Sequence, residues 1–273
     1  MPEITAKMVN ELRSKTGQGM MECKKALVET GGDIEKAVDY FRKKGIKSSI
    51  AERSATQGRV SGILSDDAKA GVLVEVNCNT DFTAKSEPIA HLGLTAAKML
   101  LTNPSMDLSQ SKEITEMLTQ ASQQTGENVR IGKTAVVSNP GGRVGLYLYG
   151  VTNKIGVLSS FSGSPSDELV RDIGLHVTGK HPIAVSLNRE GVPAAIVAKE
   201  KEIAVAQAVQ SGKPQQIAEK IAEGKMRTFY EENVLLDQEF VNAEKFKGSV
   251  SKMLEAGNAK LEKYVRVEVG QGA

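Results

Sequence analysis

One pattern occurs twice along this chain, and it constrains the fold more than any other feature of the sequence. Two apolar segments on either side of a polar turn predict a β-hairpin. In the first copy these segments are 59–64 and 71–76, and Pro88 begins a helix that follows. The hairpin and helix of the second copy are expected at 144–149, 155–161 and 166–178. The repeat predicts an α+β fold with two hairpin-plus-helix units.

Short sequence matches between the copies support the repeat. Gly-Val-Leu occurs at 71–73 and again at 156–158, and Leu-Gly-Leu at 92–94 is followed by Ile-Gly-Leu at 173–175. Repeated units of this kind are typical of related modules that pack together. A last segment, 265–269, alternates valine with charged residues and predicts a strand that completes the sheet of the second unit.

The N-terminal residues 1–45 predict three short helices. Thr5 is a suitable N-cap for the first helix and Asp33 for the third. The second helix is expected to carry its apolar residues partly on one side, namely Met21, Ala26, Leu27 and Val28. Three helices of this size make a small bundle that resembles the ubiquitin-associated domain. A core this small is expected to dock on another surface.

Two adjacent methionines stand out in the second helix. Neighbours on a helix point about 100° apart, so Met20 and Met21 cannot both face one core, and at least one is expected at the surface. Flexible, polarizable methionine suits a binding face. An incidental surface methionine is the alternative.

Residues 192–231 predict a helical hairpin. Ser211-Gly212-Lys213-Pro214 is typical of a turn in which glycine ends one helix and proline begins the next. The apolar seam near heptad spacing is expected to consist of Ile196, Ile203 and Val209 on the first arm and of Ile217 and Ile221 on the second. Two such arms predict a protruding antiparallel coiled coil, for reach or for dimerisation.

These patterns divide the chain into three parts. We expect a three-helix N-terminal domain over 1–54 and a first core subdomain over 55–140. The second core subdomain is expected over 141–273, with the coiled coil inserted at 190–232.

Composition excludes several classes of protein. A formal net charge of +2 does not predict a broad phosphate-binding face, so no direct nucleic-acid contact is expected. No apolar run reaches 18 residues and no charged-then-apolar leader precedes the first helix, so neither a membrane span nor export is predicted. Cys23 and Cys78 are too few for a disulfide framework. The expected location is the cytoplasm.

No residue pattern predicts an enzyme, a metal site or a cofactor site. The three histidines, His91, His176 and His181, are scattered and lack partners at metal-ligand spacing. Neither a phosphate-binding loop nor a dinucleotide-binding glycine motif follows a strand. Cys78 is the one candidate nucleophile, and a buried, unreactive thiol at a strand end is the alternative.

Phe82 lies in a polar stretch that follows the second strand of the first unit. Burying such a side chain is worth about 1.5–3 kcal/mol, so it either tucks under its own sheet or is held out for a partner. The corresponding stretch of the second unit, 162–168, has no aromatic residue. If Phe82 were needed only to complete the core of the unit, the second copy would keep an apolar residue there, and it does not. The comparison therefore favours the outward position.

Five sequence blocks, in order and spacing, resemble the bacterial elongation factor Ts family: 20–27, 32–35, 75–82, 126–129 and 211–214. The resemblance implies a guanine-nucleotide exchange factor that binds GDP-bound elongation factor Tu and speeds GDP release during translation elongation. It implies the same three parts as the residue patterns do.

The resemblance also implies site residues. Thr80, Asp81, Phe82 and Thr83 would lie at the nucleotide site of the partner, where Phe82 acts as a wedge and the loop disturbs the bound Mg²⁺. Because Mg²⁺ demands near-ideal octahedral geometry, a small displacement of its ligands weakens Mg²⁺ binding. No catalytic residue of this chain is implied.

Further partner contacts are implied at Met20, Met21, Thr125 and Tyr149. Three positions depart from the family pattern: Thr83 replaces a usual valine, Tyr149 a common histidine, and Thr125 an aliphatic residue. The last two match positions where the family contacts a helix of the partner.

A second hypothesis is a non-catalytic adaptor or holding factor, resembling the ubiquitin-associated domain, that binds its partner without nucleotide exchange. A third is a thiol enzyme that uses Cys78.

Overall fold

The N-terminal part of the chain is a compact bundle of three helices. The computed structural model describes residues 4–16, 18–43, 54–150 and 153–271. The bundle helices are α1 (Ala6–Thr16), α2 (Met20–Glu29) and α3 (Ile34–Lys43). Thr5 Oγ1 accepts a hydrogen bond from Met8 N, and Asp33 Oδ1 accepts one from Lys36 N. Both predicted N-caps are confirmed. The polar stretch 46–58 predicts a linker, and most of it lies outside the described residues.

The buried face of α2 differs from the prediction. Cys23, Ala26 and Leu27 are fully buried, and they follow the i, i+3, i+4 spacing that places residues on one helical stripe. Met21 and Val28 are exposed because they lie on the far side of the helix from that stripe.

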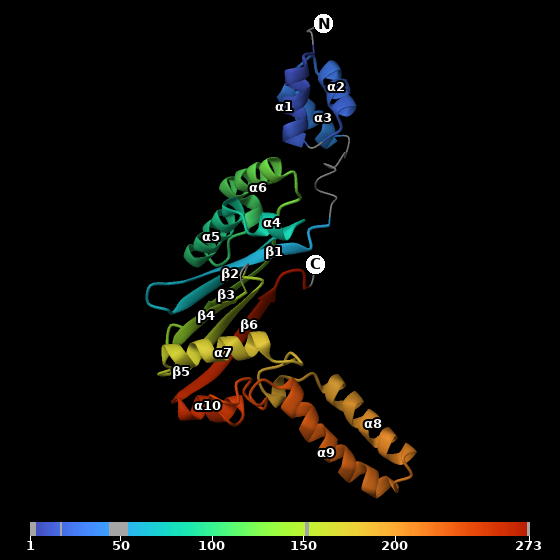
Figure 1. Ribbon diagram of the computed structural model, residues 1–273, viewed down its shortest axis with the longest axis vertical. Helices are drawn as coiled ribbons and strands as arrows, with labels where there is room; N and C mark the ends of the chain where they lie inside the picture. The colour runs from blue at the N-terminus through green and yellow to red at the C-terminus, as the bar shows by residue number, and fades with distance from the viewer. Residues whose placement is uncertain (1–3, 17, 44–53, 151–152, 272–273) are drawn as a thin grey trace.

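The core consists of two three-stranded antiparallel sheets, as Figure 1 shows. The first sheet has the order β1-β2-β3 and contains β1 (Gln57–Leu64), β2 (Ala70–Cys78) and β3 (Arg130–Ser138). The second has the order β4-β5-β6 and contains β4 (Arg143–Tyr149), β5 (Ile155–Gly163) and β6 (Ala259–Glu268). Both predicted hairpins are therefore confirmed. The last strand completes the second sheet, as expected.

Helices cover the outer faces of the two sheets (Figure 1). On the first sheet lie α5 (Glu87–Thr102) and α6 (Lys112–Thr125), and a short 3-10 helix, η1 (Leu108–Gln110), leads into α6. On the second lie α7 (Asp167–Gly179) and α10 (Val250–Ala256). The strand periodicity explains the layers. In β2, Val72 and Val74 belong to the core under the helices, and Leu73 belongs to the core between the sheets.

The inner faces of the sheets fit together through reciprocal contacts. A Cβ atom added at Gly71 would lie 2.7 Å from Leu158 Cδ2, and one added at Gly156 would lie 2.8 Å from Leu73 Cδ2. In each sheet, a leucine of the opposite sheet thus packs directly on a glycine. These are the Gly-Val-Leu segments that the sequence repeats. Their glycines are required because side chains of the opposite sheet occupy the space that a Cβ would take.

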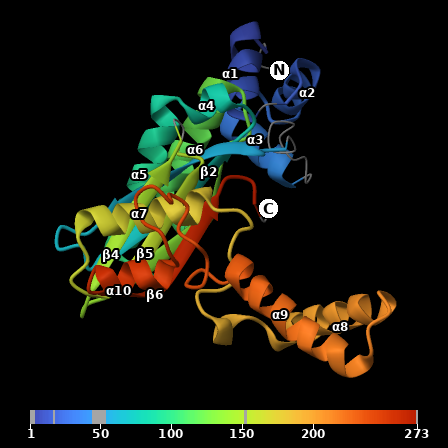
Figure 2. The same ribbon diagram turned by 60° about the horizontal axis from the view of Figure 1, so that its bottom comes forward.

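The helical hairpin consists of α8 (Ala194–Gln210) and α9 (Gln215–Asn233), and it projects away from the core in both ribbon views (Figures 1 and 2). Another 3-10 helix, η2 (Arg189–Gly191), precedes it. Gly212, at φ +81°, lies in the turn, and Pro214 is the N-cap of α9. The predicted turn is confirmed.

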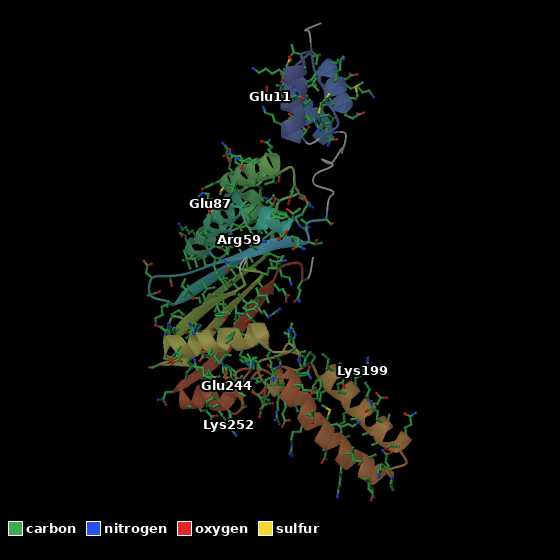
Figure 3. The ribbon with its side chains drawn as sticks, in the orientation of Figure 1. Glu11, Arg59, Glu87, Lys199, Glu244 and Lys252 are labelled. Carbon is green, nitrogen blue, oxygen red and sulfur yellow. The ribbon has the colours of Figure 1, made fainter. Side chains whose placement is uncertain are left out.

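The predicted apolar seam of the hairpin is wrong at four of its five residues; the fifth, Ile221, is half-buried. The buried residues between the arms are Ala204 and Ala208 on α8 and Ala218, Ala222 and Met226 on α9. Alanine allows the helices to approach closely, and the larger residues are therefore turned outward. Exposed instead are Ile196, Ile203, Val209 and Ile217; Lys199 marks this part of α8 in Figure 3.

Candidate functional site

The candidate site lies where β2 ends and the chain turns toward α5, whose first residue, Glu87, is labelled in Figure 3. The sequence predicted a loop here, and one helical turn, α4 (Asp81–Ala84), forms instead. Thr80 is its N-cap, and the Thr80 hydroxyl oxygen accepts a hydrogen bond from Thr83 N at 3.3 Å. A single turn is not stable in isolation, so its geometry depends on contacts with the rest of the chain.

Phe82 projects from α4 into solvent. It is 80% exposed, more than any other large apolar residue in the described part of the chain. Lys85 Nζ lies 5.8 Å from the centre of the Phe82 ring and 2.8 Å from Asp81 Oδ2. The hydrogen bond from Lys85 holds the pKa of the Asp81 carboxyl below its ordinary value. The hypothesis that Phe82 tucks under its own sheet is therefore wrong.

The carboxylate of Glu127 accepts four hydrogen bonds from the α4 turn and the residues directly before it. Glu127 Oε1 accepts hydrogen bonds from Thr80 Oγ1 at 2.6 Å and Thr83 Oγ1 at 2.8 Å. Glu127 Oε2 accepts from Asn79 N at 2.9 Å and Thr80 N at 3.0 Å. Partial burial alone would raise the pKa of Glu127, but these four hydrogen bonds outweigh it and keep the pKa below the ordinary value. The group is therefore a carboxylate at neutral pH.

Asn79 connects the site to two other segments. Its Oδ1 accepts a hydrogen bond from Asn128 N at 2.7 Å, and its Nδ2 donates one to Ser54 O at 2.6 Å. The segment after α6, the end of β2 and the start of the core thus meet at one side chain. Thr83 is buried, and its hydroxyl, the group by which it departs from the family pattern, bonds to Glu127. Thr83 therefore supports the turn from inside.

The structure argues against thiol chemistry at Cys78. The thiol is buried and donates a hydrogen bond to Thr80 O at 3.2 Å. Burial, helped by the charge of Glu127, raises its pKa to about 11, so almost no reactive thiolate exists at neutral pH. The alternative of an unreactive structural thiol is the better one. In the described residues, no group of three or more His, Cys, Asp or Glu could hold a metal ion.

Comparison with known proteins identifies the family. The family model described as Elongation factor TS matches residues 76–271. The chain is 39% identical to Elongation factor Ts of Methylococcus capsulatus over 279 residues, which cover 98% of this chain and 93% of the relative. It is 40% identical to Elongation factor Ts of Sodalis glossinidius over 275 residues, which cover 100% and 93%. The chain belongs to the elongation factor Ts family.

Members of the elongation factor Ts family are the nucleotide exchange factors of elongation factor Tu in translation elongation. The function predicted from the sequence is therefore confirmed at the level of the family. This chain is an exchange factor and not a catalyst of bond chemistry. Membership also decides against an adaptor without exchange activity. None of the described helices is long and apolar enough to cross a bilayer.

The structure places the two methionines that the elongation factor Ts resemblance implied on the surface of the N-terminal bundle. Met20 is 54% exposed and Met21 is 67% exposed, both in the first turn of α2. Both side chains are exposed, and the bundle that carries them is separate from the Phe82 turn (Figure 1).

Thr125 lies beside the Glu127 contact. It is the last residue of α6, its hydroxyl oxygen accepts a hydrogen bond from Glu127 N at 3.2 Å, and its Oγ1 donates to Ala121 O at 2.8 Å. Thr125 is half-buried, and both of these hydrogen bonds of its hydroxyl are made within the chain.

Tyr149 ends β4 and is 48% exposed. The β4–β5 connection reaches the first sheet, where Val60 N donates a hydrogen bond to Asn153 O at 2.7 Å. In the same part of β1, Gln57 pairs with Cys78, the last residue of β2. Tyr149 therefore lies at the same end of the two-sheet core as the Phe82 turn.

Sequence reasoning missed the support of the turn. Glu127 belongs to a block that carried the family resemblance, but nothing in its local pattern connects it to Thr80. The only signal was a polar Glu-Asn pair directly after a helix that ends in glycine, and such a pair is common in loops.

Proposed function

We propose that Phe82 and the α4 turn act at the nucleotide site of GDP-bound elongation factor Tu and so promote GDP release. The single observation that carries this proposal is the 80% exposure of Phe82 on a turn that four hydrogen bonds hold in place. Burial of this ring is worth about 1.5–3 kcal/mol. Since the ring has little contact with its own protein, that free energy is available to a complex.

In this mechanism, Phe82 inserts between side chains of the partner, and the turn formed by Thr80, Asp81 and Thr83 displaces the groups around Mg²⁺. Loss of octahedral geometry weakens the binding of Mg²⁺. Without Mg²⁺, the negative charge of the nucleotide phosphates is no longer neutralised, and GDP binds less tightly. Thermodynamic linkage sets the limit. The chain weakens GDP binding by the same factor by which GDP weakens binding of the chain.

We further propose contacts outside the turn. Met20 and Met21 would bind the nucleotide domain of elongation factor Tu, and their exposure supports this role. Tyr149 and Thr125 would face a helix of the partner. Thr125 lies beside Glu127, and Tyr149 lies at the same end of the core as the Phe82 turn, which supports these contacts. No direct nucleic-acid contact and no cofactor are part of the proposal. We infer that the protein acts in the cytoplasm, where translation elongation takes place.

We propose the same division of the chain as the sequence predicts. The bundle of 1–54 would be a domain similar to the ubiquitin-associated domain, and 55–140 and 141–273 would be related core subdomains. The hairpin of 190–232 would be a coiled-coil insertion in the second. The pairing of β6 with β5 supports this division, because the chain leaves the second sheet, forms the hairpin and returns.

The outer face of the hairpin is a candidate for dimerisation. The exposed apolar residues on its two arms are Ile196, Ile203, Val209 and Ile217. A second copy of the chain would bury them. Sedimentation of the protein over a wide concentration range tests this, and a monomer at every concentration would contradict it.

Stopped-flow measurement of GDP release from elongation factor Tu tests the wedge. Phe82→Ala is expected to slow the stimulated release strongly while the far-UV circular dichroism and thermal unfolding stay unchanged, because the ring is exposed. The matched control is Leu94→Ala, another exposed apolar residue, on α5. Unchanged release with Phe82→Ala would remove the wedge role. Tight binding without any stimulated release by the parent chain would contradict the proposed mechanism.

A further inference from the structure

The α4 turn has a geometry that its own sequence cannot maintain. Four residues form one helical turn, and isolated helices of that length are unstable in water. Phe82 is exposed and does not anchor the turn, and the one apolar side chain of the turn that is buried is the small methyl group of Ala84. Its conformation must come from elsewhere in the fold.

Glu127 contacts the turn from a distant part of the sequence. Both oxygens of one carboxylate are used, and each accepts two hydrogen bonds. The backbone N–H groups of Asn79 and Thr80 contact Oε2, and the hydroxyls of Thr80 and Thr83 contact Oε1. Hydrogen bonds to a charged acceptor are shorter and stronger than neutral ones. The sequence separation of the two segments makes this a tertiary contact.

The contact also orients the N-cap of the turn. The Thr80 hydroxyl donates its hydrogen to Glu127 Oε1 and accepts a hydrogen bond from Thr83 N. A hydroxyl has one hydrogen, so donating it to Glu127 directs the lone pairs toward Thr83 N. Glu127 thus determines both the position of the turn and the direction of its capping group.

The end of α6 places Glu127 for this contact. Gly126, at φ +68°, is the left-handed C-cap of α6, and its N–H donates to Ser122 O at 2.9 Å. A glycine is suited to this conformation, which reverses the chain directly after the helix. The next residue, Glu127, then points toward the end of β2 and not along the helix axis.

We infer that Glu127 is a positioning residue for nucleotide exchange, which holds the α4 turn so that Phe82 is presented in its inserting geometry before the partner binds. The inference rests on the proposed function of Phe82. A group held in advance does not lose conformational freedom when it inserts, so binding free energy is available for the displacement of GDP. Glu127 itself need not touch the partner.

This role predicts a specific kinetic change. Initial binding to GDP-bound elongation factor Tu depends on the whole interface between the two proteins, whereas insertion of Phe82 depends only on the α4 turn. Glu127→Ala is therefore expected to lower the maximal GDP release rate at saturating chain by about tenfold, with little change in the half-saturating concentration.

The experiment uses the full chain, elongation factor Tu loaded with fluorescent GDP, and four variants. Glu127→Ala removes all four hydrogen bonds. Glu127→Gln keeps the shape, and its amide oxygen still accepts from both hydroxyls, but its amide nitrogen cannot accept from backbone N–H groups; partial rescue is expected. Thr83→Val removes one hydroxyl and keeps the volume. The control, Glu116→Ala, changes an exposed glutamate of α6 whose carboxylate lies 3.7 Å from Lys112 Nζ.

A second readout does not depend on exchange activity. The amide hydrogens of Asn79 and Thr80 are donated to Glu127, so their hydrogen exchange measured by NMR reports the contact directly. Protection is expected to fall in Glu127→Ala and Glu127→Gln and to stay unchanged in Glu116→Ala. Global unfolding by urea identifies any variant that fails to fold, and Glu127→Gln, which keeps the shape of the side chain, then decides.

The outcomes separate this inference from the proposed function. If Phe82→Ala leaves release unchanged, the proposed function fails. If Phe82→Ala slows release but Glu127→Ala, with its amides deprotected, does not, only the positioning role is overturned. If the amides stay protected in Glu127→Ala, the carboxylate does not hold the turn. A lower maximal rate together with lost protection and partial rescue by glutamine supports the inference.

Discussion

The two strand-to-helix connections of the core differ although the strands that precede them are alike. In the first unit, the chain after β2 forms the extra turn α4 and presents Phe82 to solvent. In the second unit, β5 ends at Gly163, at φ +84°, and the chain runs directly to Ser166, the N-cap of α7. The same framework thus carries a short, polar connection or a longer one with an exposed aromatic ring.

The two connections are also fastened by opposite charges. A carboxylate, Glu127, accepts hydrogen bonds from the first. The guanidinium of Arg143 contacts the second connection. It donates a hydrogen bond to Pro165 O at 3.0 Å and forms an ion pair with Asp167. Arg143 lies on the adjacent strand, whereas Glu127 follows a helix that the second unit lacks at this position. The comparison teaches that α6 is what allows the first connection to be long and still ordered.

The largest expected effect contrasts the phenylalanines of the two units. Phe161 is fully buried in the second unit, and Phe82 is exposed in the first. Phe161→Ala is expected to lower the free energy of unfolding by about 3–5 kcal/mol, whereas Phe82→Ala is expected to change it by less than about 0.5 kcal/mol. Urea denaturation of both variants measures the difference. Equal losses of stability would contradict the assignment of Phe82 as a binding residue.

Acid is expected to weaken the second unit before it releases the Phe82 turn. His176 is buried, and burial lowers its pKa to about 4. Its Nδ1 accepts a hydrogen bond from Val241 N at 3.1 Å, and its Nε2 lies 3.0 Å from Gln238 Oε1. The neutral ring is required for the first of these bonds.

The sign follows from linkage. The unfolded chain takes up a proton at His176 as the pH falls below about 6.5, and the folded chain does not until about pH 4. Stability is therefore expected to fall over that interval by on the order of 3 kcal/mol. The pKa of Glu127 is lowered, so its contribution is lost only below the ordinary carboxyl range. Unfolding in urea at pH 7, 5.5 and 4.5 measures the loss; His176→Gln is expected to reduce the pH dependence.

The reciprocal glycines allow a matched comparison of the two sheets. Gly71→Ala and Gly156→Ala each place a methyl group against a leucine of the opposite sheet. Overpacking of this kind costs about 1–3 kcal/mol, and the two variants are expected to lose similar amounts of stability. Thermal and urea unfolding measure both. A large cost at one glycine and none at the other would show that the sheets do not fit together symmetrically.

The smallest effect is expected at the second connection. Arg143→Ala removes an ion pair whose aspartate is largely exposed and one hydrogen bond to a backbone carbonyl. Partly exposed pairs contribute at most about 1 kcal/mol, so the free energy of unfolding is expected to change by that amount or less. GDP release stimulated by the variant is expected to equal that of the parent chain. A slower release would assign the second connection a part in exchange.

Much of this architecture could be predicted from local sequence. Alternating apolar residues give both hairpins, Thr5 and Asp33 cap their helices, and the Gly-Lys-Pro turn separates α8 from α9. These features depend on residues close together in the chain. The family and its function followed from sequence blocks, and the exposure of Phe82 followed from the comparison of the two units.

Other features could not be predicted because they depend on the neighbours that a side chain meets. Isoleucine and alanine are both apolar, so the pattern of α8 suited two seams, and close contact with α9 selected Ala204 and Ala208 over Ile203. In α2, Met21 and Val28 fitted an apolar face that the bundle does not use.

The sequence by itself determined most of the elements, the two units and the exposed position of Phe82. Only the tertiary structure decided how that residue is held, because Glu127 and the turn are far apart in the chain and meet where α6 ends beside β2. Short-range patterns specify the conformation of a segment. The contacts that fix a segment in space come from the packing of helices on sheets, which no local pattern records.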